Sequence, residues 1–76
     1  MNKERRKQLE ELSTKIEDIK SEIENLRDEE QEYADNMPES LQSSEKHDLA
    51  ENAVSSMDET IDSLDTAIEN LGEAAQ

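Results

Sequence analysis

The fold is decided by residues 9–33, which read LEELSTKIEDIKSEIENLRDEEQEY. Apolar residues recur there in steps of 3, 4, 3, 4 and 3 from Leu9 to Leu26, and the same spacing continues to Glu30 and Tyr33. It is typical of the heptad repeat abcdefg of a coiled coil, in which positions a and d face a partner helix. Position a holds Leu9, Ile16, Ile23 and Glu30, and position d holds Leu12, Ile19, Leu26 and Tyr33. So narrow an apolar stripe predicts a helix packed against another helix.

A second heptad stripe supplies the expected partner helix. Its a positions are Val54, Ile61 and Ile68, and its d positions are Ala50, Met57, Leu64 and Leu71. Pro38 must end the first helix, Ser43 and Ser44 are candidate N-caps of the second, and Gly72 is a candidate C-cap. We therefore expect an all-α fold, an antiparallel two-helix coiled-coil hairpin that can dimerise into a four-helix bundle. The expected parts of this single unit, residues 1–76, are a helix over about 3–35, a turn over about 36–44 and a helix over about 45–71.

Two registers of the hairpin are compatible with the charges that flank the stripes. The first pairs Lys20 with Asp58 and Arg27 with Glu51, and it places Leu9 opposite Leu71. The second, shifted by one heptad, pairs Lys20 with Asp65 and Arg27 with Asp58 but leaves Leu9 without an opposite residue. We prefer the first register because every apolar residue from Leu9 to Leu26 then faces an apolar residue.

Small residues occupy the g positions of the second helix: Ala53, Thr60, Ala67 and Ala74. The stems of Lys15, Glu22 and Glu29 from the first helix could lie across them, with the charged tips in water. Alternatively, these four positions form a second contact surface on which another hairpin packs closely, giving a homodimer. The sequence leaves both interpretations open.

Composition and charge limit the classes of function. The chain has 76 residues, no cysteine and a formal net charge of −14. No disulfide or thiolate metal site is possible, and no apolar run approaches the roughly 20 residues that cross a bilayer. The negative charge disfavours direct binding to nucleic acid or to an anionic membrane and favours a protein partner with a basic surface. We expect a cytoplasmic protein.

Residues for catalysis are scarce. His47 is the only histidine, Gly72 is the only glycine, and most carboxylates fall at solvent-facing heptad positions. A catalytic acid or base needs a partly buried pocket that shifts its pKa, and a phosphate-binding loop needs several glycines. Glu30 at a seam position and His47 are best explained as polar residues at the end of the coiled coil. We expect no enzyme activity, no cofactor and no metal site.

The acidic outer surface of the first helix is the most unusual feature. Glu17, Asp18, Glu24 and Asp28 lie on it. One interpretation is a solvated coiled-coil face. The other is a mimic of the phosphate backbone, with carboxylates on a rigid rod placed to meet the lysines and arginines of a nucleic-acid-binding protein.

Residues 32–42, EYADNMPESLQ, and the amphipathic helix after them resemble small uncharacterised acidic hairpin proteins of phages and mobile elements in Gram-positive bacteria. The resemblance covers roughly residues 30–72, and its motif is Asn-Met-Pro-Glu before a leucine. It implies an accessory gene, a class in which blocking host defence is common, and it assigns no activity to any residue. The expected function is a non-catalytic protein-binding hairpin. The alternatives are an acidic nucleic-acid mimic of the anti-CRISPR or anti-restriction type, and a purely structural self-assembling coiled coil.

Overall fold

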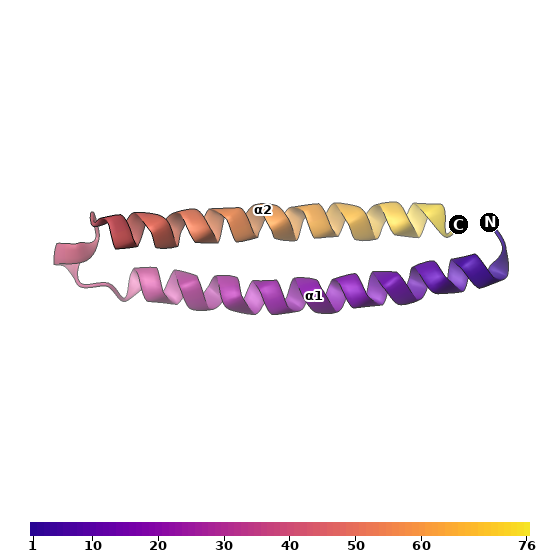
Figure 1. The fold of residues 1–76 in the computed structure, drawn as a ribbon, viewed down its shortest axis with the longest axis horizontal. Coiled ribbons are helices and arrows are strands. Elements are labelled where there is room, and N and C mark those ends of the chain that lie inside the picture. Colours follow the sequence, from indigo (N-terminus) through magenta and orange to yellow (C-terminus); the bar gives the residue numbers. More distant parts are fainter.

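The computed structural model describes residues 1–76 as two long helices that lie side by side and antiparallel (Figure 1). Helix α1 spans Lys3–Asp35 and helix α2 spans Glu45–Ala74, with one 3-10 turn, η1, at Glu39–Leu41 between them. The molecule is a rod of 59 × 14 × 11 Å with both termini at the end opposite the turn. The predicted all-α antiparallel hairpin is confirmed.

Side-chain caps define where each helix begins. The Asn2 side chain accepts a hydrogen bond from the Arg5 backbone N–H at 2.8 Å, and Ser44 accepts one from the His47 backbone N–H at 3.3 Å. Both residues have extended backbone conformations, as N-cap residues do. Ser44 was one of the two candidate caps of the second helix. Asn2 was missed in the sequence, although asparagine is among the preferred N-cap residues.

The predicted C-cap at Gly72 is wrong. Helix α2 continues through Gly72 to Ala74, and no glycine has a positive φ. A glycine C-cap is needed where the chain must reverse directly after the helix. Because Glu73 and Ala74 are good helix formers, they carry the helix one more turn at the modest entropic cost of an internal glycine.

The preferred register of the hairpin is also wrong, and the alternative shifted by one heptad is correct. Lys20 Nζ lies 2.6 Å from Asp65 Oδ1, and Arg27 Nε donates to Asp58 Oδ1 at 2.8 Å. Leu9, which this register leaves without an opposite seam residue, is nevertheless less exposed than Leu12.

The connection explains the shift. After Asn36, the chain forms η1, and the Leu41 carbonyl accepts hydrogen bonds from the Ser44 backbone N–H and hydroxyl at 3.0 and 2.6 Å. These bonds hold the connection in a compact turn beside the start of α2. The start of α2 lies beyond the end of α1 along the rod (Figure 1).

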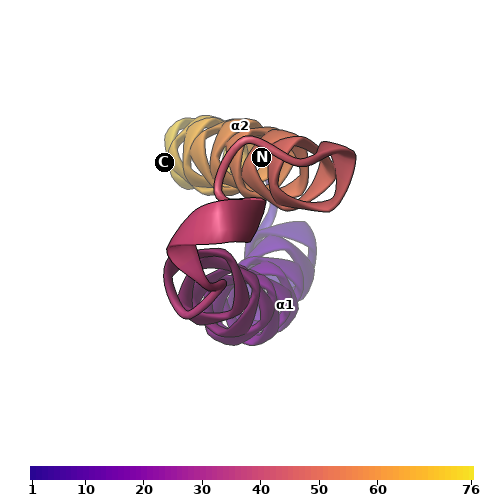
Figure 2. The same cartoon turned by 90° about the vertical axis from the view of Figure 1, so that its left-hand side faces the viewer.

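The seam between the helices contains little buried surface. Only Ala34, Ala50 and Val54 are buried, and no large side chain is fully buried. On α1, the e-position residues Ser13 and Ala34 are less exposed than the d-position leucines. The face of α1 that contacts α2 is therefore turned toward position e and away from position d. Figure 2 views the molecule from the turn and shows the two helices as a single layer with neither side covered.

Candidate binding groove

Four large side chains of α1 that the heptad pattern assigned to the seam are half exposed. Leu12 and Ile19 are each 48% exposed, Leu26 is 57% exposed and Tyr33 is 50% exposed. They recur every seven residues, so they form one row along α1, which we call the large wall. This row was missed as a candidate surface. The available signal was the small Ser13 and Ala34 at position e, which allow α1 to turn that side toward α2.

Ion pairs close the opposite side of the seam. Lys20 and Arg27 are at position e of α1, and Asp65 and Asp58 are at position e of α2. The hydrogen-bonded contact with Asp65 raises the pKa of Lys20, and hydrogen bonds to Asp58 and Asp28 raise the pKa of Arg27. Positions e and d flank position a on opposite sides of a helix. The large wall therefore faces the side of the hairpin without these ion pairs.

The small g-position residues of α2 lie on the same side as the large wall. Ala53 and Ala67 are half buried, whereas Thr60 and Ala74 are exposed. We call this row the small wall, and the space between the two rows the open groove. The ion pairs Lys20–Asp65 and Arg27–Asp58 place the middle of both rows in the same stretch of the rod.

A hollow on this side demonstrates that the groove is not filled. Leu26, Glu29 and Glu30 of α1 and Met57 of α2 together line a space of about 300 Å³. Glu29 and the other two residues that could have covered the small wall, Lys15 and Glu22, are exposed.

Charge is distributed unequally along the two edges of the groove. On α2, the g and c positions from Leu49 to Ala74 carry no charged residue, although the helix contains nine acidic residues at other positions. The uncharged row consists of Leu49, Ala53, Ser56, Thr60, Ser63, Ala67, Asn70 and Ala74. The α1 edge carries Lys15, Glu22 and Glu29.

The groove reaches the turn at its Tyr33 end. Tyr33, Met37, Pro38 and Leu41 contribute to a second hollow of about 400 Å³, with Asn36 and Lys46 at its border. Leu41 is 46% exposed there. The apolar surface thus continues from the large wall onto the connection.

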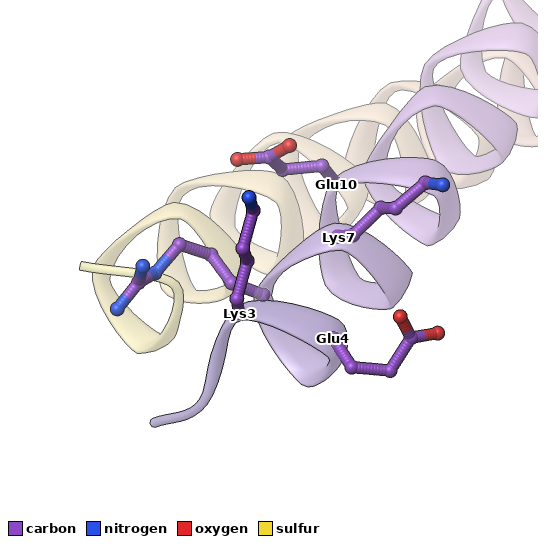
Figure 3. A pocket seen from close by; sticks show the side chains of 5 residues that line it. Lys3, Glu4, Lys7 and Glu10 are labelled. Carbon is purple, nitrogen blue, oxygen red and sulfur yellow. The ribbon is translucent and has the colours of Figure 1, made fainter.

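The hollow at the opposite end of the rod has a different character (Figure 3). It measures about 620 Å³ and is lined only by charged residues, namely Lys3, Glu4, Arg6, Lys7 and Glu10. In Figure 3, Lys7 and Glu4 point away from Lys3 and Glu10, so the labelled side chains do not converge on one point. Mixed charges without an enclosing wall do not form a built ligand site.

The predicted acidic face is exposed along α1. Glu17, Asp18, Glu24 and Asp28 are all exposed, and Asp28 also accepts a hydrogen bond from Arg27 at 3.0 Å. Glu17 and Glu24 lie close enough to Lys20 to contribute to the rise of its pKa. These carboxylates are therefore placed on a continuous helix, outside the open groove.

The residues considered for chemistry are not assembled into a centre. His47 Nε2 lies 3.7 Å from Glu51 one helical turn away, and Glu30 is half exposed beside the groove. No three His, Cys, Asp or Glu side chains converge in a way that could hold a metal ion. Neither helix combines the length and the apolar character needed to cross a bilayer.

Comparison with protein families, curated proteins and solved structures finds no match. The resemblance of residues 30–72 to mobile-element proteins therefore stays a prediction.

Proposed function

We propose that this chain is a non-catalytic protein-binding hairpin that takes up a helical partner in the open groove. The observation that carries the proposal is the large wall: Leu12, Ile19, Leu26 and Tyr33 are each about half exposed and recur every seven residues on one side of α1. Single exposed apolar residues are ordinary, whereas an aligned row of large apolar residues on a small polar protein favours an interaction surface. A partner helix packed along this row would bury these four side chains between itself and the hairpin.

The thin seam supports the same proposal. Burial of apolar surface is the main stabilising contribution to folding, and small chains have little of it. Only three of 76 residues are buried in the isolated hairpin. A partner helix in the groove would convert half-exposed leucine and isoleucine side chains into core, so binding and stability are coupled.

The groove favours a partner helix with an apolar stripe and basic residues on the side that contacts α1. Glu22 and Glu29 line the α1 edge, and the whole chain carries a charge of −14. This field attracts basic proteins. We place this activity in the cytoplasm, that of the host cell if a mobile element encodes the chain.

The outer carboxylates favour a second candidate function, an acidic nucleic-acid mimic that inhibits a DNA- or RNA-binding or defence protein. Four of the 22 acidic residues take part in ion pairs, namely Asp28, Asp58, Asp65 and Glu51. The remaining carboxylates are available to meet lysines and arginines of a partner. Under this alternative the partner contacts Glu17, Asp18, Glu24 and Asp28, and the groove is dispensable.

Two variants of the chain separate these functions in a capture experiment. The groove variant combines Ile19→Gln and Leu26→Gln, and the face variant reverses Glu17, Asp18, Glu24 and Asp28 to lysine. Each immobilised chain is exposed to a bacterial lysate, washed with rising salt and compared with wild type, after circular dichroism has verified its helicity. Loss of capture by the groove variant alone supports groove binding. Loss by the face variant alone supports the mimic, and retention by both overturns the two proposals.

A further inference from the structure

We propose that the open groove is occupied by a second copy of this chain, related by a two-fold axis parallel to the rod. Each large wall then packs on the small wall of the other copy. This inference rests on the proposed function for the groove as the binding surface, and it names a second acidic copy as the partner in place of a basic protein. In this arrangement each α1 lies antiparallel on the other copy's α2, both turns lie at the same end, and the product is a four-helix bundle.

The exposed area is the first argument for a second copy. The chain exposes 5676 Å². A compact monomer of 8.7 kDa exposes about 4,700 Å², so the hairpin has about 1,000 Å² in excess. A stable interface buries about 800 Å² on each partner. Pairing along one face of the 59 Å rod would therefore remove roughly the excess from each copy.

The side-chain sizes of the two walls are complementary. The large wall and the small wall run along the same stretch of the rod, since Lys20 is paired with Asp65 and Arg27 with Asp58. An axis parallel to the rod keeps every residue at its own level. The large wall, Leu12, Ile19, Leu26 and Tyr33, then faces the small wall of the other copy, Ala53, Thr60, Ala67 and Ala74, so a row of large residues packs on a row of small ones.

The charges select this axis over the other possible two-fold axis. On the parallel axis, the α1 edge with Glu22 and Glu29 meets the α2 edge of the other copy, which is uncharged from Leu49 to Ala74. The other axis is perpendicular to the rod and crosses the groove. It packs α1 on α1 of the other copy, so that Glu22 lies opposite Glu22 and Leu26 lies opposite Ile19. Like charges placed opposite each other disfavour that arrangement.

Disulfide trapping distinguishes the two axes without interference, because the chain has no cysteine of its own. An Ile19→Cys chain and an Ala67→Cys chain carrying tags of different mass are mixed and oxidised. A disulfide requires Cβ atoms about 3.8 Å apart. We expect a mixed disulfide because the proposed axis brings position 19 of one copy close to position 67 of the other. The control mixture combines Ile19→Cys with Leu26→Cys. A mixed disulfide in the control and not in the test mixture would overturn the proposed axis.

A matched pair of arginine variants tests the second copy itself. Ala67→Arg puts a charge in the centre of the interface, whereas Thr66→Arg puts the same charge on the exposed outer face. Sedimentation equilibrium should give a dimer for wild type and Thr66→Arg, and a dissociation constant at least about 30-fold weaker for Ala67→Arg. Equal constants for the two variants would contradict the interface.

Salt distinguishes a second copy from a basic partner. Two chains of charge −14 repel each other, so added salt should tighten self-association, whereas it should weaken binding to a basic protein. Wild type that stays monomeric at about 100 µM and at high salt, where screening is nearly complete, overturns this inference. If capture of a protein by the wild type is still lost in the Ile19→Gln, Leu26→Gln variant, the proposed function stands without it. If wild type stays monomeric and the Ile19→Gln, Leu26→Gln variant still captures the same protein, the inference and the proposed function are both wrong.

Discussion

Truncation of Ile19 should destabilise the isolated hairpin less than truncation of Val54, although the heptad pattern assigns both residues to the seam. Val54 is 5% exposed and Ile19 is 48% exposed. The comparison of Val54→Ala with Ile19→Ala therefore measures the rotation of α1 that creates the open groove. Side-chain size alone predicts the opposite order, because an isoleucine loses more atoms than a valine when each is replaced by alanine.

The magnitudes follow from the exposures. Val54→Ala removes two buried methyl groups at about 0.8 kcal/mol each, and the cavity left behind raises the cost to about 2 kcal/mol. Ile19→Ala removes three carbons, but half of that surface is already in water, so the loss is about 1.2 kcal/mol with no cavity. Alanine is the better helix former at both sites and returns about 0.5 kcal/mol to each variant. The expected net losses are about 1.5 kcal/mol for Val54→Ala and about 0.7 kcal/mol for Ile19→Ala.

Thermal unfolding followed by circular dichroism provides the assay. The chain must be dilute, at about 1 µM, because any association that covers Ile19 would add to its cost. In a domain of this size, each 1 kcal/mol lowers Tm by about 4–8 °C, so the two variants should differ by several degrees. A larger loss for Ile19→Ala than for Val54→Ala in dilute solution would mean that Ile19 is packed in the seam, and the groove would not exist.

Three further predictions concern stability. Gly72→Ala should raise Tm, with a gain of up to about 1 kcal/mol, since a methyl group there meets no atom within 4 Å and the position is helical; no gain would indicate that α2 is frayed at that point. Salt at about 0.5 M should raise Tm by screening repulsion among the carboxylates, and a fall would mean that the ion pairs dominate. The raised pKa of Lys20 means that its stabilising contribution is complete below the ordinary value of 10.5 and is lost as pH rises through the higher value in the folded state. Alkaline unfolding of Lys20→Gln should lack that loss, and identical pH profiles for variant and wild type would refute the contact with Asp65.

The sequence predicted the hairpin but not its register. Seven-residue periodicity and Pro38 are local features, and they suffice for two helices and a break. The register depends on the turn, and both registers gave Lys20 and Arg27 an acidic partner. The conformation of the turn, in which Ser44 donates two hydrogen bonds to the Leu41 carbonyl, leaves no periodic signal in the sequence.

The small edge of the groove is visible in the sequence. The row Ala53, Thr60, Ala67 and Ala74 allowed two interpretations, coverage by the stems of Lys15, Glu22 and Glu29 or a second contact surface, and the second stays a prediction. The large wall was not predicted, because position d was expected to face α2. Which side of α1 packs depends on how closely Ser13 and Ala34 allow the helices to approach, and this is a property of the pair of helices.

A neutral paramagnetic gadolinium chelate can report whether the open groove is a binding surface, because it broadens the NMR signals of methyl groups that it can approach. We would compare the line broadening of the Ile19 and Leu26 methyl signals with that of Ile61, which is on the seam, in dilute and concentrated protein. We expect strong broadening of Ile19 and Leu26 in the dilute sample and protection in the concentrated one, with little change at Ile61. Protection in the dilute sample, or full broadening at every concentration and with every captured partner, would contradict it.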